Sequence, residues 1–266
     1  MEPANHQRLS QLLGNDWRDF IPLEGVQRRD VDAFLMHYRV EHHLQRVGDH
    51  EARLTVGKPP THWTLPIPIA RAADGWRFDS KAGGEEIRAR RIGRNELTAV
   101  QAVLAYHDAQ MEYASEDRDG DGALEYAQNI FSTPGRHDGL YWAEDDSAQL
   151  SPLGPLFGKT LPGEDWHGYH FRILDRQGPS APGGAYGYLI GSRMSRGFAL
   201  IAWPASYADT GVMSFMISHQ GQVFEKDLGP DGDRVARLMA AFDPDDSWNE
   251  VSEASMTPPA HPDGST

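Results

Sequence analysis

The chain has 266 residues, of which 39% are hydrophobic and 10% aromatic, a composition typical of a globular protein with a sizeable core. It carries 39 acidic against 25 basic residues, and the resulting net charge of -14 would repel phosphate backbones and anionic lipid, which excludes nucleic acid and membrane surfaces as partners. It has no cysteine, which excludes disulfides, thiolate metal sites and a cysteine nucleophile.

No stretch of the sequence is long and apolar enough to span a membrane, which takes roughly 20 residues. The first segment, Met1–Phe20, also lacks the apolar core of a signal peptide. No membrane span is therefore predicted, while Met1 can equally be an expression start placed after a removed export signal.

Residues 1–90 are predicted to form a small α+β unit, a helix followed by a meander of strands. Apolar residues three and four apart predict the helix over Arg28–Val47. Its histidines lack the spacing of a zinc-binding pair and are interpreted as surface residues. They are His37, His42 and His43. The predicted strands are Ala52–Val56, Trp63–Ala70 and Trp76–Asp79.

A long amphipathic helix is predicted from Leu97, because apolar residues recur on one face and no Gly or Pro interrupts them before Gly120. Asn95 is expected to cap its first turn by accepting a backbone N–H, and Glu96 suits the positive end of the helix dipole. The segment that follows Gly83-Gly84 is interpreted as a connector or a first helical turn. A second unit is placed at residues 91–242.

The helix is expected to end in an acidic loop with the pattern of a metal site. Calcium prefers oxygen ligands, and this loop offers Asp117, Asp119 and Asp121 at positions 1, 3 and 5 of a calcium-binding loop, with Gly122 at position 6. Position 12 departs from the pattern, because Gln128 replaces a bidentate glutamate; Glu125 is the remaining candidate ligand. Two interpretations stay open: a calcium site, or an acidic turn whose aspartates accept local hydrogen bonds.

The rest of the chain is predicted to be an antiparallel β-meander packed on the long helix, which makes the fold class α+β. A short second helix is expected up to Phe131, and a closing helix over Arg234–Phe242. The polar tail, residues 243–266, is predicted to be disordered. The predicted strands are Trp166–Leu174, Tyr186–Ile190, Gly197–Trp203, Val212–Ser218 and Gln222–Lys226.

One group of residues indicates chemistry instead of binding. Carboxylates and histidines near tryptophans are typical of a glycoside-handling site, where acids transfer protons and rings stack on sugars. The residues concerned are Glu164, Asp165, His167 and His170, with Trp142 and Trp166. They also fit a solvated turn beside tryptophans that cover a core. The Gly-rich run Gln177–Tyr188 lacks the strand, helix and lysine of a phosphate cradle and is interpreted as a hairpin loop.

The second half of the chain resembles the globular heads of type IV pilin-like and type II secretion pseudopilin-like proteins. The resemblance covers about Leu97–Leu228 and rests on LTAVQAVLAYHDAQMEYASEDRDGDGALEYA, GYHFRIL and GFALIAWPASYADTGVMSFMISHQGQVFEKDLG in this order. It implies a long helix packed on an antiparallel sheet. The apolar N-terminal helix that anchors and polymerises pilins is replaced here by a polar first unit, so the resemblance does not extend to filament assembly.

The chain as a whole, about Leu12–Pro230, more closely resembles a bacterial family catalogued only as a domain of unknown function. This resemblance rests on GWRFDSKAGGEEIRARRIGRNEL, STPGRHDGLYW, SPLGPL and QGPSAPGGAYGY. Members of that family look like exported proteins, which implies a periplasmic or extracellular location and no particular activity.

The sequence therefore predicts an exported, non-enzymatic α+β protein with a pilin-like second unit and a structural calcium ion. It is expected to act through contacts with a protein or glycan of the cell envelope. The competing hypothesis is a hydrolase or glycan-active enzyme, and a third is an assembly subunit related to pseudopilins.

Overall fold

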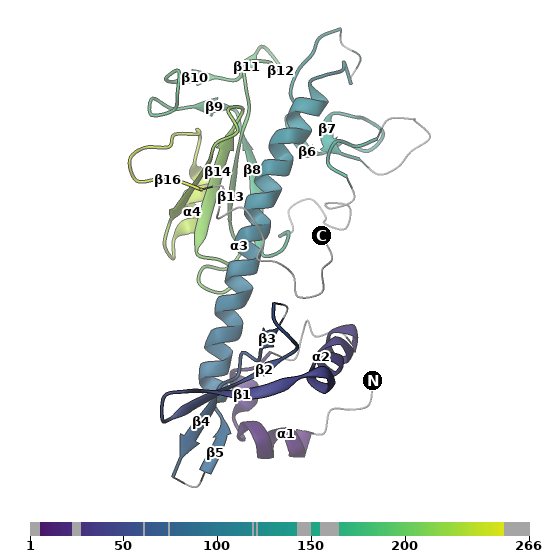
Figure 1. Ribbon diagram of the computed structural model, residues 1–266. Coiled ribbons are helices and arrows are strands. Elements are labelled where there is room, and N and C mark those ends of the chain that lie inside the picture. The colour runs from purple at the N-terminus through teal and green to yellow at the C-terminus, as the bar shows by residue number, and fades with distance from the viewer. Residues whose placement is uncertain are drawn as a thin grey trace. The chain divides into compact units, whose positions relative to one another are not determined.

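The structure is a computed structural model that describes residues 6–22, 28–60, 62–73, 75–118, 120, 122–142, 150–154 and 165–252 (Figure 1). These residues form helices and several antiparallel sheets, which confirms the predicted α+β class. The chain divides into two compact units, Met1–Arg91 and Ile92–Thr257, and each is described by itself. None of the helices in the described part is long and apolar enough to cross a membrane.

The first unit begins with α1 (His6–Leu13), the 3-10 turn η1 (Trp17–Asp19) and α2 (Arg28–Val40). α2 is shorter than the predicted helix, because the chain turns into a strand that pairs with its neighbour from His42 onward. His42 and His43 therefore lie on a strand and not on a helix. Strand pairing, a tertiary interaction, has overridden the helical periodicity of this segment.

The sheet of the first unit is antiparallel throughout. Its strand order is β1-β2-β4-β5, with β3 also paired to β2. The strands are β1 (His42–Val47), β2 (Glu51–Val56), β3 (Trp63–Thr64), β4 (Ile69–Ala72) and β5 (Gly75–Phe78). The predicted strand Trp63–Ala70 is divided into β3 and β4 around Pro66 and Pro68, which cannot donate to a ladder. β1 is an edge strand, and all six of its residues are exposed.

The long helix α3 (Ser80–Tyr113) has 34 residues; it begins in the first unit and continues in the second. It begins at Ser80, well before the predicted start at Leu97. Asp79 Oδ1 accepts the Ala82 N–H at 3.0 Å, so an aspartate caps the first turn at this earlier position.

Two glycines that sequence reasoning placed before the helix lie inside it. A Cβ on Gly84 would meet the Phe20 carbonyl oxygen at 2.5 Å, and one on Gly83 would meet the Ile67 side chain at 2.9 Å. These positions have room for glycine only, because α3 approaches its neighbours closely there. The glycines thus serve packing and do not end the helix, although each costs helix propensity.

Asn95 and Glu96, expected as cap residues, lie in the interior of α3 and bond to the first residue of β14 and the segment before it instead. Asn95 Nδ2 donates to the Thr210 carbonyl oxygen at 2.9 Å. Glu96 Oε1 accepts the N–H groups of Val212 and Met213 at 2.9 and 3.0 Å. Both side chains therefore tie the helix to the sheet of the second unit.

The main sheet of the second unit has the order β16-β15-β14-β13-β8 and is antiparallel throughout (Figure 1). Its strands are β8 (Tyr169–Leu174), β13 (Ala199–Pro204), β14 (Met213–Ser218), β15 (Val223–Asp227) and β16 (Asn249–Glu250). The central register pairs Leu200 with Ile217 on one side and with Ile173 on the other. An antiparallel meander on a long helix is thus what forms, as predicted.

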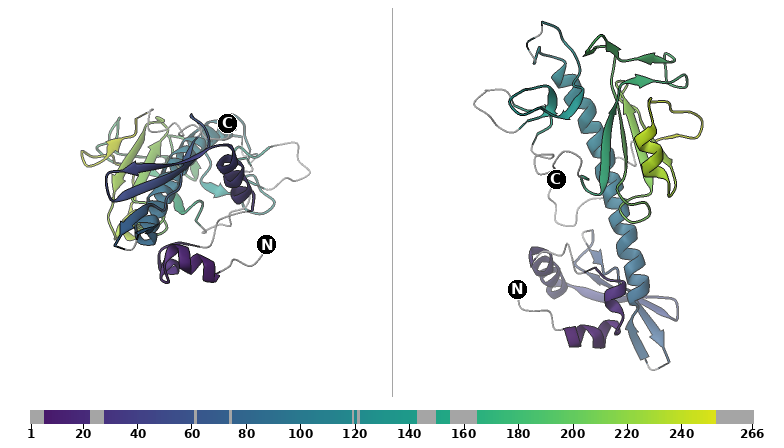
Figure 2. Two further views of the ribbon diagram at one scale, coloured as in Figure 1. Left: turned by 60° about the horizontal axis from the view of Figure 1, so that its bottom comes forward. Right: turned by 180° about the vertical axis from the view of Figure 1, so that it is seen from behind.

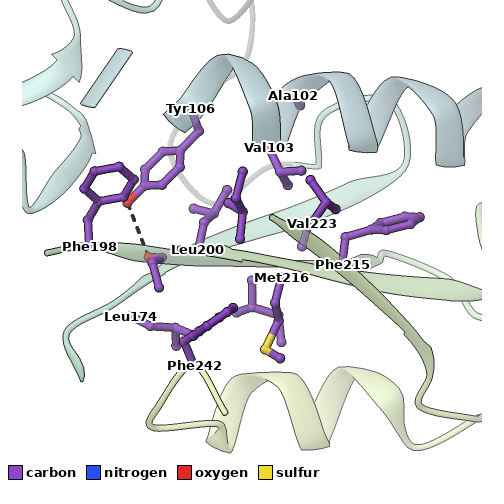
Figure 3. Packing of buried hydrophobic residues seen from close by; sticks show 14 of the residues in the cluster. Ala102, Val103, Tyr106, Leu174, Phe198, Leu200, Phe215, Met216, Val223 and Phe242 are labelled. Carbon is purple, nitrogen blue, oxygen red and sulfur yellow. Dashed lines mark hydrogen bonds between the residues drawn. The ribbon is translucent and has the colours of Figure 1, made fainter. Parts of the chain in front are cut away.

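Helices cover both faces of this sheet (Figures 2 and 3). On one face α3 packs Val103 and Tyr106 against Leu200, and Tyr106 Oη donates to the Ala199 carbonyl oxygen at 3.3 Å (Figure 3). On the other face lie Phe242 and α4 (Gly232–Leu238). Every residue of β13 is buried as a result, which explains its continuous apolar run.

The first ten residues of the tail that was predicted to be disordered are ordered. Residues 243–252 are described, and β16 pairs with β15 through Phe224–Glu250 and Glu225–Asn249. Trp248 and Val251 are buried in the core of the second unit. Two apolar residues in a polar run were too weak a pattern to predict a strand, yet they suffice where a sheet edge is already present.

Three short ladders complete the second unit. β9 (Arg176–Gln177) pairs with β10 (Tyr186–Gly187), so the Gly-rich run is the loop of a hairpin, as interpreted from the sequence. β11 (Leu189–Ile190) pairs with β12 (Arg193–Met194), while β6 (Asn129–Phe131) and β7 (Gly139–Tyr141) form a parallel pair. The predicted second helix up to Phe131 is absent: the chain is extended there, and Tyr126 bridges to Met194.

Candidate contact surface

The acidic loop after α3 is organised by Asp117. Its Oδ1 accepts the Gly120 N–H at 2.8 Å, and its Oδ2 accepts the Gly122 N–H at 2.9 Å. Both glycines have positive φ, 76° and 85°, which a side chain would disfavour. Asp119 and Asp121, the other predicted aspartate ligands, lie outside the described residues. The described part of this loop is a hydrogen-bonded turn.

The two remaining predicted ligands, Glu125 and Gln128, differ in how far they are buried. Glu125 is half-buried, and Gln128 is exposed with its Nε2 donating to the Ser192 carbonyl oxygen at 2.6 Å. Among the residues that the structure describes, no three His, Cys, Asp or Glu are grouped so as to hold a metal ion.

Arg118 fastens this loop to the end of α3. Its guanidinium donates to the carbonyl oxygens of Tyr113 and Glu112 at 3.3 and 3.4 Å, and these oxygens also accept the N–H groups of Glu116 and Ser115. Its Cζ lies 5.8 Å from the Tyr113 ring centre and 5.9 Å from that of Trp142. His137 stacks on Trp142 at 4.3 Å. In the sequence, the only sign of these contacts is that a basic residue, Arg118, follows the first aspartate of the acidic loop.

A buried amide fixes the segment that follows the loop. Gln110 is fully buried; its Nε2 donates to the Ala127 carbonyl oxygen, and its Oε1 accepts the Ala127 N–H, both at 2.8 Å. Nε2 also donates to Tyr106 Oη at 3.0 Å. The amide of Gln110 thus bonds both backbone groups of Ala127, as a paired strand would. Its signal in the sequence was a polar residue seven positions after Val103, on the apolar face of the helix.

The hairpin loop between β9 and β10 is held in the same way by Gln177. This buried side chain donates from Nε2 to the carbonyl oxygens of Pro182 and Gly184, both at 2.8 Å. Tyr188 Oη donates to its Oε1 at 3.2 Å. The loop therefore has a defined shape although it is rich in glycine.

Apolar side chains are exposed on neighbouring segments at this end of the second unit. β11 pairs with β12, and the other edge of β12 bonds to the segment after the acidic loop through the Tyr126 N–H and the Met194 carbonyl oxygen at 2.8 Å. These elements lie at the end where α3 terminates (Figure 1). We call this the distal surface, defined by Leu124, Tyr186, Leu189, Ile190 and Arg196.

A partly buried histidine lies behind this surface. Burial lowers the pKa of His219, and the nearby His107 lowers it further. The His219 ring packs against that of Tyr188, 5.6 Å between centres, and its Nε2 lies 3.5 Å from Tyr186 Oη. The position next to it, Gly197, has φ 146°, and a Cβ there would meet His219 Nδ1 at 2.7 Å. This histidine is therefore packed as a core side chain.

Two of the predicted catalytic residues that the structure describes, Asp165 and His167, lie in one tight turn. Asp165 Oδ2 accepts the Gly168 N–H at 2.9 Å, inside a tight turn that Trp166 and Tyr169 close by two backbone hydrogen bonds. His167 occupies this turn with φ 49°. Glu164 lies outside the described residues.

The other members of that group lie on different elements. The His170 ring is 5.5 Å from that of Trp203, whose Nε1 donates to Asp233 on α4 at 2.8 Å. Trp142 lies at the C-terminal end of α3 beside Arg118, whereas the Trp166 turn approaches Asn95. The helix rises about 1.5 Å per residue, so these two places are on the order of 27 Å apart along α3. The tryptophans therefore do not form two walls of one cleft.

Comparison with known proteins gives a family and no activity. A family model described as "Protein of unknown function (DUF2950)" matches residues 1–251. No curated protein and no solved structure matches the chain.

Proposed function

The chain belongs to the DUF2950 family of proteins of unknown function, and for this member we propose a non-enzymatic role as an exported, pilin-like protein of the cell envelope. Its second unit binds a protein partner through the distal surface. The observation that supports this most is the combination of exposed aliphatic side chains with loops that buried polar groups hold in shape, which is the construction of a preorganised binding surface.

The rigidity of the surface comes from contacts inside the unit. Gln110 and Gln177 satisfy the backbone of the two irregular segments, and Arg118 satisfies the end of α3. Because these groups are already paired, a partner does not have to order the loops when it binds. That lowers the entropic cost of association.

The exposed side chains favour a protein over a glycan. Sugars are held by exposed aromatic rings, but Trp142, Trp203 and Trp248 are buried and Trp166 is half-buried. Among the described residues of the second unit, the exposed large apolar side chains are not aromatic, and Leu124 and Ile190 are examples; the exposed Trp63 and Trp76 belong to the first unit. Aliphatic side chains gain by being removed from water in a protein interface. The hydrolase alternative has no comparable support, since Trp142 and Trp166, its two aromatic walls, lie on the order of 27 Å apart along α3.

We also propose that calcium orders the acidic loop, with Asp117, Asp119 and Asp121 as ligands and Glu125 and Gln128 as further candidates. The ion would neutralise the aspartates and fix the end of α3 to the following segment. Melting the full chain with EDTA and then with added calcium tests this. A metal that binds only the folded state stabilises it by about 2.7 kcal/mol at 100 times its Kd. Asp119→Ala should abolish the shift, and Asp246→Ala, an exposed control, should keep it.

The binding role is tested with a photo-crosslinking residue in place of Ile190 in the intact protein, in its native cell envelope. Leu238 on α4 is the matched control, because both side chains are aliphatic and exposed, 59% and 72%, in the same unit. A discrete protein adduct from position 190 that position 238 does not give is the expected result. Equal adducts from both positions, or none from position 190, would contradict the proposal.

A further inference from the structure

The sheet of the first unit ends in a strand whose outer edge no other described segment pairs. β1 is the terminal strand in the order β1-β2-β4-β5, and each of its residues from His42 to Val47 is exposed. The outer edge of such a strand presents backbone N–H and C=O groups, which another strand can pair.

The alternation of hydrogen-bonded positions along the β1–β2 pair shows which backbone groups of β1 point away from the sheet. The Gly57 N–H donates to the Glu41 carbonyl oxygen at 2.8 Å, and β1 then pairs with β2 in unbroken register from His42–Val56 to Val47–Glu51. In an antiparallel pair, bonded positions alternate with positions whose backbone groups point away. The N–H and C=O groups of His42, Leu44 and Arg46 therefore point away from β2.

The local sequence protects this edge only weakly, because Arg46 is the one charged residue among the six of β1. β1 contains no proline or lysine, and its regular register leaves no bulge, although these are the usual devices that prevent edge-to-edge pairing. α2, which precedes β1, has no buried residue. α2 and β1 contact each other through Tyr38 and His42. The His42 ring stacks on the Tyr38 ring at 3.8 Å between centres, and His42 Nδ1 lies 2.8 Å from the Tyr38 carbonyl oxygen.

The same stretch exposes apolar side chains that would be removed from water by a partner. Met36 and Val40 on α2 are 57% and 59% exposed, and Leu44 and Val47 on β1 are 62% and 47% exposed. A stable interface buries about 800 Å² per partner, more than the edges of two six-residue strands provide. Apolar side chains beside the edge are therefore required, and this stretch supplies them on both faces of the sheet, because Leu44 and Val47 point to opposite faces.

Charge favours a second copy of the chain as the occupant. Residues 1–91 contain 14 Lys and Arg against 13 Asp and Glu, whereas the second unit, residues 92–257, contains 11 against 25. Two copies of the second unit repel each other, but two copies of the first unit meet without net repulsion. An isologous contact needs only a self-complementary patch, and an antiparallel strand edge is one.

We propose that two copies of this protein associate through β1, which pairs antiparallel with its own copy to form a continuous sheet across a two-fold axis. Hydrogen bonds between the two copies of β1 can only join residues whose backbone groups point outward. The register that uses all three such residues places Leu44 opposite Leu44 and His42 opposite Arg46. The apolar side chains of α2 and β1 pack beside the junction.

The absence of cysteine allows a direct test by disulfide crosslinking of single-cysteine variants of the full chain. In the proposed register the two copies of position 44 have Cα atoms about 5.5 Å apart, within the range that a disulfide spans. The two copies of position 47 are about 20 Å apart, at roughly 3.4 Å per residue. Under a mild oxidant, Leu44→Cys should give a covalent dimer, while Val47→Cys on the same strand and Leu238→Cys on α4 should not.

Sedimentation of the unmodified chain over a range of concentrations provides the second readout. A dimer that Leu44→Lys dissociates, and that Leu238→Lys leaves intact, supports the proposal, because a charge at the junction would be buried. A chain that stays monomeric at high concentration overturns it and leaves the edge to a strand of another protein. Equal crosslinking from positions 44 and 47 would overturn the proposed register. A dimer that survives Leu44→Lys would show that β1 is not the contact surface.

Discussion

Buried amide side chains give the second unit its irregular parts. Gln110 and Gln177 each offer a donor and an acceptor from one rigid plane, and backbone groups of Ala127, Pro182 and Gly184 bond to them. An amide in the core is stable only when its groups are paired, so each glutamine also selects one path for the neighbouring chain.

Replacing Gln110 with leucine should destabilise the protein strongly. The change leaves the N–H and C=O groups of Ala127 buried without partners, and each such group costs about 1–3 kcal/mol. Urea denaturation measures the loss, expected at about 3 kcal/mol or more. Gln101→Leu on the exposed side of the same helix is the control and should stay within about 0.5 kcal/mol of the unmodified protein. Equal stabilities of the two variants would falsify this role of Gln110.

His219 should make stability depend on pH in a defined direction. Its folded-state pKa is lowered by burial and by His107, below the ordinary value of 6.5. Between that lowered pKa and 6.5 the unfolded chain binds more protons, so the free energy of unfolding rises with pH across this window. His219→Gln removes the contribution. Denaturation of both proteins at about pH 5.5 and 7.5 should show the smaller loss on acidification in the variant; parallel pH profiles would contradict the assignment.

At the scale of elements, α3 is unusual because glycines occur inside it without ending it. The helix continues through Gly83 and Gly84, because burial of its later side chains, such as Val103 and Tyr106, outweighs the local propensity. Close approach to Phe20 and Ile67 depends on the missing Cβ atoms.

Two substitutions in α3 should therefore have opposite signs. Gly84→Ala places a Cβ 2.5 Å from the Phe20 carbonyl oxygen and should lower the melting temperature. Gly93→Ala, in the same helix, meets nothing within 4 Å and should stabilise the protein by roughly 0.5–1 kcal/mol through helix propensity. Calorimetry of both variants checks this. Stabilisation by both would mean that the helix shifts away from Phe20 at little cost.

At the scale of the whole molecule, the acidic charge is concentrated in residues 92–266. Repulsion inside this part opposes folding, and salt screens it over about 10 Å at 0.1 M. Raising sodium chloride to about 0.5 M at neutral pH should therefore raise the melting temperature. The control is the same titration near the sequence pI of about 5.2, where net charge vanishes and the salt effect should shrink. An undiminished effect there would point to a cause other than net charge.

Much of the regular structure could be predicted from the sequence. The strands of the second unit follow from alternating or continuous apolar runs such as Tyr169–Leu174, and the hairpin loop Gln177–Tyr188 follows from its glycines. Errors arose where a tertiary contact reversed a local preference: Asn95 and Glu96 have the form of cap residues, yet they bond to distant backbone. The candidate surface was harder to foresee, because its exposed residues are not contiguous in sequence.

By itself, the sequence determined the α+β class, the long amphipathic helix on an antiparallel meander, and the acidic net charge, because periodicity and charge are local or additive properties. Only the tertiary structure decided where α3 begins, that Asp165 and His170 face different elements, and that Leu124 and Ile190 lie on neighbouring segments. These outcomes depend on which surfaces meet when the chain folds. Contacts between residues far apart in sequence, such as Glu96 with Met213, fix them, and no local pattern encodes such pairs.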